Sequence, residues 1–185
     1  MSPGCDGTSS RGSQSWKRSR LTARRHGHRF RPRRRTPISA SASTRPWPRS
    51  TADGAARGNP GPAGIGVVIE DDQGMRLRTL HRWLGVATNN EAEYHALIDG
   101  LKAVKDWRPD RLEVFLDSKL VVEQVTGKYK TKKPELQQLH AEVIRLLGEF
   151  PDVQFKHVGR EGNRGADHLA NMAIDAHVPK KKFGG

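Results

Sequence analysis

The segment from Asp53 to Gly64 places a carboxylate directly before a turn rich in glycine and proline, and an apolar run, residues 65–69, follows. Glycine permits positive φ and close approach of another backbone, while proline removes an N–H donor and stiffens the chain. The pattern indicates a turn entering a strand, with rigid amides that could contact a polar ligand. An ordinary hairpin connection explains the segment equally well when it is taken alone.

Strand patterns lie around this turn. Residues 64–70 predict a strand, residues 70–74 a turn, and residues 75–85 a second strand whose alternation slips near its middle. The result is an antiparallel meander that begins at Asp53. Residues 45–52 lack the alternating apolar pattern expected before Asp53, so we expect the first strand to be incomplete at its start.

A helix is predicted from residue 88 to about residue 106. Thr88 and Glu91 have the spacing of a capping box, in which each side chain bonds the backbone N–H of the other. Glu93 lies one turn before Leu97, on the apolar face that continues through Leu101. A carboxylate on a packed face is costly unless a cation meets it.

The next elements bring another carboxylate to the end of a strand. Residues 111–116 alternate as a strand that ends at Asp117, and Asp117 or Ser118 can cap the helix that stops at Gly127. A plain helix cap is therefore an alternative to a functional role for Asp117. Residues 128–133 form a basic stretch that is either a solvated loop or a patch that contacts phosphate.

The last third of the chain predicts two helices and a strand. Pro134 suits the first position of a helix, and residues 153–158 predict a strand with His157 near its end. We expect residues 159–165, with three glycines, to form a mobile loop. In the final helix Asp167 has i, i+3, i+7 spacing with two apolar residues, which places it on the packed face.

Charge is distributed unevenly along the chain. Residues 1–50 contain 13 of the 33 Lys and Arg but only one of the 20 Asp and Glu, so this region holds +12 of the net charge of +13. Residues 1–50 show no hydrophobic periodicity and are expected to be disordered. Three interpretations are open: a basic arm that adds nucleic-acid affinity, a transit-like leader, or sequence without function, as from a misassigned start.

Composition excludes several classes of protein. The single Cys5 allows no internal disulfide and no thiolate metal site. No apolar run approaches the roughly 18 residues that span a bilayer. We therefore expect a cytoplasmic protein without a membrane partner, monomeric and without an obligate protein partner.

Four carboxylates come from four separate elements: Asp53, Glu93, Asp117 and Asp167. If they converge, they require cations, and oxygen ligands without His or Cys favour Mg²⁺, with Mn²⁺ as a substitute. Two such ions about 4 Å apart can hold both oxygens of an in-line phosphoryl displacement. A glycosidase is the other use of paired acids, but few aromatic residues are available to stack on sugars. Phosphodiester hydrolysis is the preferred interpretation.

The ordered set of motifs resembles type 1 ribonuclease H over about residues 52–177. The motifs are Asp53-Gly54 with residues 58–64, then residues 88–94, then Asp117-Ser118, then His157, Asn163 and residues 166–171. The resemblance implies an α/β fold with a five-stranded mixed sheet flanked by helices. It also implies hydrolysis of the RNA strand of RNA/DNA hybrids with two Mg²⁺ ions.

The same resemblance implies roles for single residues. Asp53 would contact both metal ions, Asp167 would complete the site that activates water, and Glu93 and Asp117 would hold the ion that faces the leaving O3′. His157, on a mobile loop, would assist water or product departure, although a structural histidine at a strand end is the alternative. The residues that would contact the hybrid are Gly54, Asn59, Gly61, Thr88, Asn89, Asn90, Lys119 and Asn163.

These implications define a domain plan and one competing function. We expect a disordered extension over residues 1–50, a catalytic domain over residues 51–178 and a basic tail over residues 179–185. The long basic helical handle of some relatives is reduced to residues 127–133. The competing function is a protein that binds hybrids or other nucleic acids but cleaves poorly, because an incomplete first strand does not position Asp53.

Overall fold

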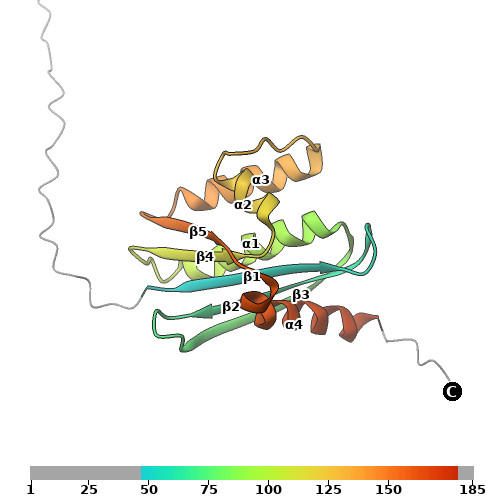
Figure 1. Ribbon diagram of the computed structural model, residues 1–185, viewed down its shortest axis with the longest axis horizontal. Coiled ribbons are helices and arrows are strands. Elements are labelled where there is room, and N and C mark those ends of the chain that lie inside the picture. The colour runs from blue at the N-terminus through green and yellow to red at the C-terminus, as the bar shows by residue number, and fades with distance from the viewer. Residues whose placement is uncertain (1–46, 179–185) are drawn as a thin grey trace, which may run out of the picture. The chain divides into compact units, whose positions relative to one another are not determined.

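The computed structural model describes residues 47–178, and the predictions for residues 1–46 and 179–185 lie outside them. Five strands and four helices follow one another in these residues (Figure 1). In chain order they are β1 (Arg49–Ala56), β2 (Gly61–Glu70), β3 (Arg76–Ala87), α1 (Asn89–Lys105), β4 (Leu112–Leu116), α2 (Lys119–Val125), α3 (Pro134–Leu147), β5 (Val153–His157) and α4 (Arg160–His177).

The strands form one sheet in the order β3-β2-β1-β4-β5. β1, β2 and β3 are antiparallel neighbours, whereas β1 pairs in parallel with β4, and β4 in parallel with β5. The predicted five-stranded mixed sheet is thus confirmed. In the central strand β1, Asp53 pairs with Gly66 of β2 and comes directly after Ala52, the last residue that pairs with β4.

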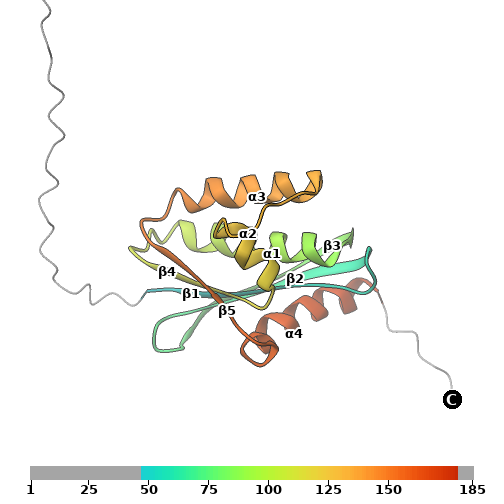
Figure 2. The ribbon, with the colours of Figure 1, turned by 45° about the horizontal axis from the view of Figure 1, so that its top comes forward.

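The helices form two unequal layers on the sheet. Figure 2 shows α1, α2 and α3 on one side and α4 on the other. The main hydrophobic core lies on the side of α1, where it includes Leu97, Leu101, Leu112, Leu116 and Val143. On the opposite side α4 packs against β1, β2 and β3, and Figure 1 shows β4 and β5 beyond the area that it covers.

The first strand is complete, so the expectation of a damaged start was wrong. β1 begins at Arg49 and pairs with β2 at every residue from Arg49 to Ala56. Its inward positions near the start are the small residues Ser50 and Ala52, which are 2% and 0% exposed. Small residues are needed here because α1 lies close: a Cβ added at Gly100 would be 2.9 Å from the Ser50 hydroxyl. The strand therefore lacks the large apolar residues by which strands are predicted.

The predicted mobile loop at residues 159–165 was also wrong, because α4 begins at Arg160 with Gly159 as N-cap. Close packing against β2 explains the helix. A Cβ added at Gly66 of β2 would lie 2.0 Å from the carbonyl oxygen of Ala166. Such backbone contact outweighs the low helix propensity of the glycines in the first turns of α4.

Other local predictions are confirmed. Thr88 and Glu91 form the complete capping box of α1. Ser118, rather than Asp117, caps α2 by accepting a hydrogen bond from the Val121 N–H. Pro134 occupies the start of α3. Among the described residues, no helix has the length and apolar character needed to cross a membrane.

Candidate active site

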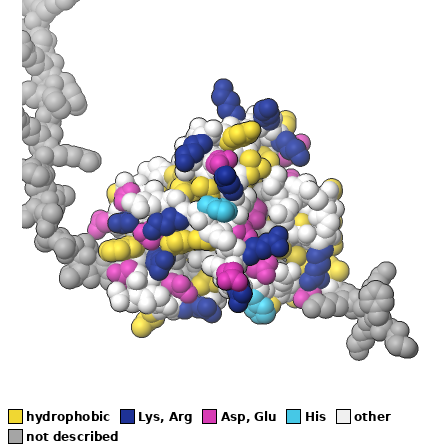
Figure 3. All heavy atoms as spheres, in the orientation of Figure 1, with side chains coloured by type: hydrophobic (Ala, Val, Ile, Leu, Met, Phe, Trp, Pro, Cys, Tyr) yellow, Lys and Arg dark blue, Asp and Glu magenta, His cyan; other side chains and the backbone are white. Residues whose placement is uncertain are grey.

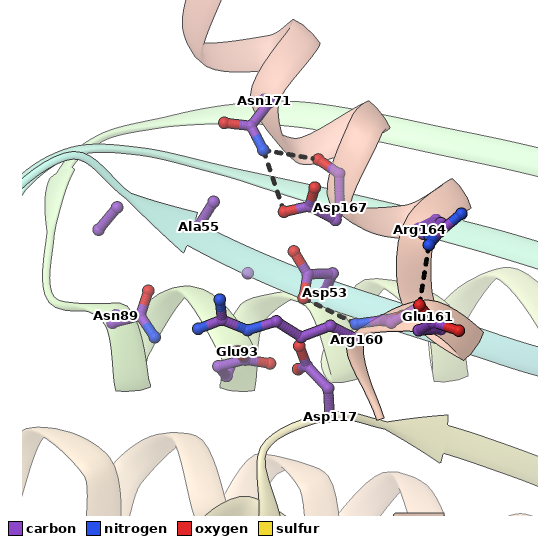
Figure 4. Close-up of a pocket in the computed structure, with 13 residues that line it drawn as sticks. Asp53, Ala55, Asn89, Glu93, Asp117, Arg160, Glu161, Arg164, Asp167 and Asn171 are labelled. Carbon is purple, nitrogen blue, oxygen red and sulfur yellow. Dashed lines mark hydrogen bonds and ion pairs between the residues drawn. The ribbon is translucent and has the colours of Figure 1, made fainter. Parts of the chain in front are cut away.

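Three of the four predicted acids meet at the edge of β1 and β4. Asp53 lies within β1, Glu93 in the first turns of α1 and Asp117 directly after β4. One carboxylate oxygen from each lies within 4.8 Å of the other two. Figure 4 shows the three side chains converging from these separate elements. The convergence predicted from sequence is therefore observed for these three.

Gly54 sets the approach between β1 and α1. A Cβ at this position would lie 2.1 Å from the Ala92 carbonyl carbon and 2.2 Å from the Glu93 nitrogen. Only glycine fits such a contact between two backbones. The missing side chain of Gly54 therefore brings Glu93 beside Asp53.

The carboxyl groups of Asp53 and Glu93 are strongly perturbed. Each residue is 4% exposed. Burial, followed by the charges of Asp117 and Asp167, raises the pKa of Asp53 from 3.8 to about 7. Burial, followed by the charges of Asp53 and Asp117, raises the pKa of Glu93 from 4.5 to about 9. Three acids held this close carry an electrostatic cost that a cation would remove.

Two carboxylate oxygens lack a partner. Glu93 Oε2 and Asp117 Oδ1 are buried and accept no hydrogen bond from the described residues. Buried polar atoms are normally satisfied, so an orphaned anionic oxygen indicates a missing ligand. Oxygen atoms as the donor set suit Mg²⁺ or Mn²⁺.

Asn163 holds Asp53 from the other side. This residue is 1% exposed, and its side-chain amide donates to Asp53 Oδ1 at 2.7 Å. A longer contact of 3.5 Å reaches the carbonyl oxygen of Ala52. The amide thus fixes one oxygen of Asp53. Its predicted contact with substrate stays a prediction.

Asp167 lies apart from the three clustered acids, and its predicted place on the packed face of α4 was wrong. It is exposed, because the buried face of α4 consists of Asn163, Ala166, Ala170, Ala173 and Ile174. Figure 4 shows Asp167 on the far side of Asp53 from Asp117. Its Oδ1 accepts a 3.0 Å hydrogen bond from Asn171. Asp167 nevertheless lines the same cavity as the other three acids.

This cavity has a volume of about 480 Å³ and collects residues that sequence reasoning missed. Besides the four acids and Asn163, it is lined by Arg160, Glu161, Arg164 and Asn171. Figure 4 shows the Arg160 side chain extending across the acids toward Asn89. Arg160 was missed because residues 159–165 were expected to form a loop, whereas α4 begins at residue 160. With this helix, the spacing of Arg160, Asn163 and Asp167 predicts a shared face.

His157 is the last residue of β5, not part of a loop. Its Nε2 lies 3.0 Å from the backbone oxygen of Asp117, and the side chain is exposed. A second cavity, of about 320 Å³, joins His157 to Glu93, Asp117 and Arg160. The imidazole therefore borders the acids without joining them.

Comparison with known proteins shows the family. A family model described as reverse transcriptase-like matches residues 51–173. Ribonuclease HI of Halobacterium salinarum is 44% identical over 123 residues, which are 66% of this chain and 62% of that protein. The crystal structure of RNase H1 from the same archaeon aligns with a TM-score of 0.68 and covers 70% of this chain and 98% of that chain. The chain belongs to the type 1 ribonuclease H family.

Two further members of this ribonuclease H family add context. A bifunctional protein of Mycobacterium tuberculosis is 44% identical over 126 residues, which are 68% of this chain but 35% of that protein. This chain thus spans about a third of the mycobacterial relative. LC11-RNase H1, solved in complex with an RNA/DNA hybrid, is 43% identical with a TM-score of 0.67 and covers 70% of this chain and 97% of that chain.

Of the residues that resemblance to ribonuclease H assigns to substrate, Gly54, Asn89 and Asn163 line the first cavity. Asn59 Oδ1 accepts a 3.3 Å hydrogen bond from the Asn89 backbone, which ties the turn after β1 to the start of α1. Asn89 is exposed. The hydroxyl and backbone N–H of Thr88 are both bonded to Glu91. Lys119, with a 74% exposed side chain, lies 3.8 Å from Glu123.

The remaining two candidates are held by local structure. Gly61 begins β2, where an added Cβ would lie 2.2 Å from the carbonyl oxygen of Arg57. Asn90 is the second residue of α1 and is partly exposed. Contact of these side chains and amides with a hybrid stays a prediction.

Proposed function

We propose that this chain cleaves the RNA strand of RNA/DNA hybrids by two-metal-ion phosphodiester hydrolysis. The observation that carries the proposal is the cluster of Asp53, Glu93 and Asp117, with their ligand oxygens within 4.8 Å of one another. Family membership supports the same reaction, since relatives over this region are named ribonuclease H. No thiol or imidazole joins this cluster in the described residues, which favours a hard cation.

The acids fit divalent metal ions. Orphaned oxygens on Glu93 and Asp117 are available as ligands, and the raised pKa values of Asp53 and Glu93 would fall on binding a cation. Asp53 would contact both ions, Glu93 and Asp117 would hold the ion on the leaving-group side, and Asp167 would hold the ion on the water side. When bound, such ions neutralise phosphate charge and lower the pKa of a coordinated water.

The surrounding residues prepare this site. Asn163 holds one oxygen of Asp53 and so orients the carboxylate before any ion arrives. Asn171 does the same for Asp167. His157 borders the second cavity with Glu93 and Asp117, where an imidazole can exchange a proton with water or with the departing product.

A hybrid is the substrate that the rim of the cavity suits. Asn59 and Asn89 place amide groups at the junction of the β1–β2 turn and α1, and an amide can both donate to and accept from a 2′-hydroxyl. That hydroxyl is the group that distinguishes RNA from DNA. The complex of LC11-RNase H1 with an RNA/DNA hybrid supports the same substrate class.

The competing function, hybrid binding with impaired cleavage, depended on an incomplete first strand. β1 runs from Arg49 to Ala56, pairs with β2 along its whole length and pairs with β4 from Arg49 to Ala52. Its one structural premise is therefore absent, and hydrolysis is the function we carry forward.

A cleavage assay with an end-labelled RNA/DNA hybrid tests the proposal. We expect RNA fragments with Mg²⁺ or Mn²⁺, none with EDTA, and none from single-stranded RNA or from duplex RNA or DNA. Asp53→Asn, Glu93→Gln, Asp117→Asn and Asp167→Asn should each lower the rate by about two or more orders of magnitude while hybrid binding remains. Asp152→Asn, an exposed acid outside the cavity, is the matched control. Cleavage that persists in EDTA would contradict the metal assignment.

A further inference from the structure

One side of the sheet carries a cluster of cations and aromatic rings outside the active site. We call it the open face and define it by Arg49, Arg111, Glu113, Phe115 and Lys156. These residues belong to β1, β4 and β5 or adjoin them. They lie on the side of the sheet that carries α4; that helix packs against β1, β2 and β3, so β4 and β5 lie largely outside the area it covers (Figure 1). Figure 3 views this side and shows Lys and Arg side chains beside hydrophobic ones to the left of the central group of acids.

Glu113 organises the cations of the open face. It accepts from Arg111 at 2.8 Å and pairs with Lys156 Nζ at 3.0 Å and with Arg49 Nε at 3.7 Å. Burial raises the pKa of Glu113, but its bonds to Lys156 and Arg111 lower it more, so the pKa lies below the usual value for a glutamate. Glu113 is therefore ionised at neutral pH and anchors three cations.

The acid and its cations differ in exposure. The side chain of Glu113 is 8% exposed, whereas those of Arg49, Arg111 and Lys156 are 37%, 38% and 46% exposed. The anion thus lies beneath and the cations lie outward. One charge against three leaves the surface that solvent meets positive, although each cation has a partner.

Each cation of the open face lies over an aromatic ring. The Arg49 guanidinium lies 4.7 Å and the Lys156 ammonium 5.4 Å from the centre of the Phe115 ring. Arg111 lies 5.1 Å from the Trp47 ring. A guanidinium fixed by an aromatic ring and a carboxylate loses little freedom when it binds a phosphate or stacks on a base.

The open face continues directly from the catalytic acids. Arg49 is the register partner of Glu113, and Thr51 the partner of Phe115. Two residues further along these parallel strands stand Asp53 and Asp117. Alternate residues on a strand point to the same side, so Phe115 precedes Asp117 on one face by about 7 Å. The spacing between successive nucleotides in a strand is similar to this distance, so one strand could pass from the open face to the acids.

We propose that the open face binds a single-stranded stretch of nucleic acid that flanks the hybrid in the active site. The inference rests on the proposed function. Charge complementarity favours this ligand, because a polyanion is attracted to the exposed cations that lie over the buried Glu113. Its bases can also stack on a guanidinium that an aromatic ring supports. Residues 1–46 share the positive sign of the surface and are a poor occupant.

The test measures binding of the full chain to fluorescein-labelled oligothymidylate of 12 nucleotides over a series of salt concentrations. We expect Lys156→Gln to weaken binding about three- to tenfold and to flatten the salt dependence by about 0.7 per lost phosphate contact. Phe115→Leu should weaken binding by a similar factor through loss of the ring. Lys156→Arg should restore wild-type affinity.

Lys102→Gln is the matched control. Lys102 is also paired with a glutamate, at 2.6 Å, and its side chain is 50% exposed, but it lies on α1 in the opposite layer. Equal affinity of Lys156→Gln and wild type, with both folded by circular dichroism, would overturn the proposal. So would an equal loss in Lys102→Gln.

The basic segment at residues 1–46 is common to all of these variants, so differences between them report on the open face. Cleavage of a blunt hybrid by the wild-type chain tests the proposed function separately. A chain that cleaves blunt hybrid but shows no effect of Lys156→Gln or Phe115→Leu refutes the open face alone. A chain that binds oligothymidylate through Lys156 but cleaves nothing refutes the hydrolytic function.

Discussion

The Asn163 side-chain amide donates a 2.7 Å hydrogen bond to Asp53 Oδ1, joining α4 to β1 across 110 residues of sequence. Both residues are nearly inaccessible to solvent. A bond in this position restricts the rotation of a carboxylate that the proposed mechanism needs in one orientation.

Replacing Asn163 with alanine should therefore impair the chemical step more than substrate binding. We expect Asn163→Ala to lower kcat about 10- to 100-fold, with little change in the dissociation constant for hybrid. Single-turnover cleavage and fluorescence anisotropy measure the two quantities. Retained kcat in a folded Asn163→Ala protein would show that the bond only stabilises the packing of α4.

The raised pKa values predict an unusual dependence of stability on pH. Asp53 and Glu93 have pKa values of about 7 and 9 in the folded protein, against 3.8 and 4.5 ordinarily. Well below pH 3.8 both groups are protonated in either state, and their contribution to stability is fully present. As the pH rises from 4 toward 9, the unfolded chain releases protons that the folded chain retains, so stability falls.

Thermal melts in EDTA at several pH values measure this effect. We expect the melting temperature to decline between pH 5 and pH 9, Mg²⁺ to reverse much of the decline, and Glu93→Gln to flatten it by removing one titrating group. Asp152→Asn removes an exposed acid and should leave the slope as in wild type. A metal-free slope unaffected by Glu93→Gln would contradict the predicted titration.

His157 should contribute less than the acids. Its Nε2 lies 3.0 Å from the backbone oxygen of Asp117, and within residues 47–178 it forms no hydrogen bond with a carboxylate of the cluster. We expect His157→Ala to slow turnover about 10-fold, less than any acid variant. The pH–rate profile is the decisive measurement: an unchanged profile would identify His157 as a structural residue at the end of β5.

Deleting residues 1–45 should leave Mg²⁺-dependent cleavage intact. The deletion retains Trp47, which lies over Arg111, and the whole of β1. It removes 12 of the 13 basic residues in residues 1–50, so we expect the dependence of hybrid binding on salt to become shallower. An unchanged slope would reject the basic-arm interpretation, and loss of cleavage in a folded protein would place a needed element within residues 1–45.

Sequence patterns predicted the elements whose signals are local. The capping box at Thr88 and Glu91, the end of β4 just before Asp117 and the start of α3 at Pro134 depend on spacing and cap chemistry within a few residues. Glu93 stood out because a carboxylate occupied an apolar face. Three of the four acids were therefore found and correctly brought together from sequence.

The errors arose where distant packing overrides local preference. Ser50 reads as a poor strand residue, but its small size fits Gly100 of α1. The glycines after His157 read as a loop, yet α4 forms because its backbone touches Gly66 of β2. The same error hid Arg160, which became a candidate only when a helix placed it over the acids. Contacts of this kind are not encoded in any short window of sequence.

The contact of Gly54 with the backbone of Ala92 and Glu93 also bears on how the site can diverge among relatives. The spacing between Asp53 and Glu93 is set where main chain meets main chain, without an intervening side chain. Substitutions that repack Leu97, Leu101 or Val104 alter the core beneath α1 but do not enter this junction. The distance between the Asp53 and Glu93 carboxylates is therefore not affected by changes in the hydrophobic core, whereas any side chain at Gly54 would change it.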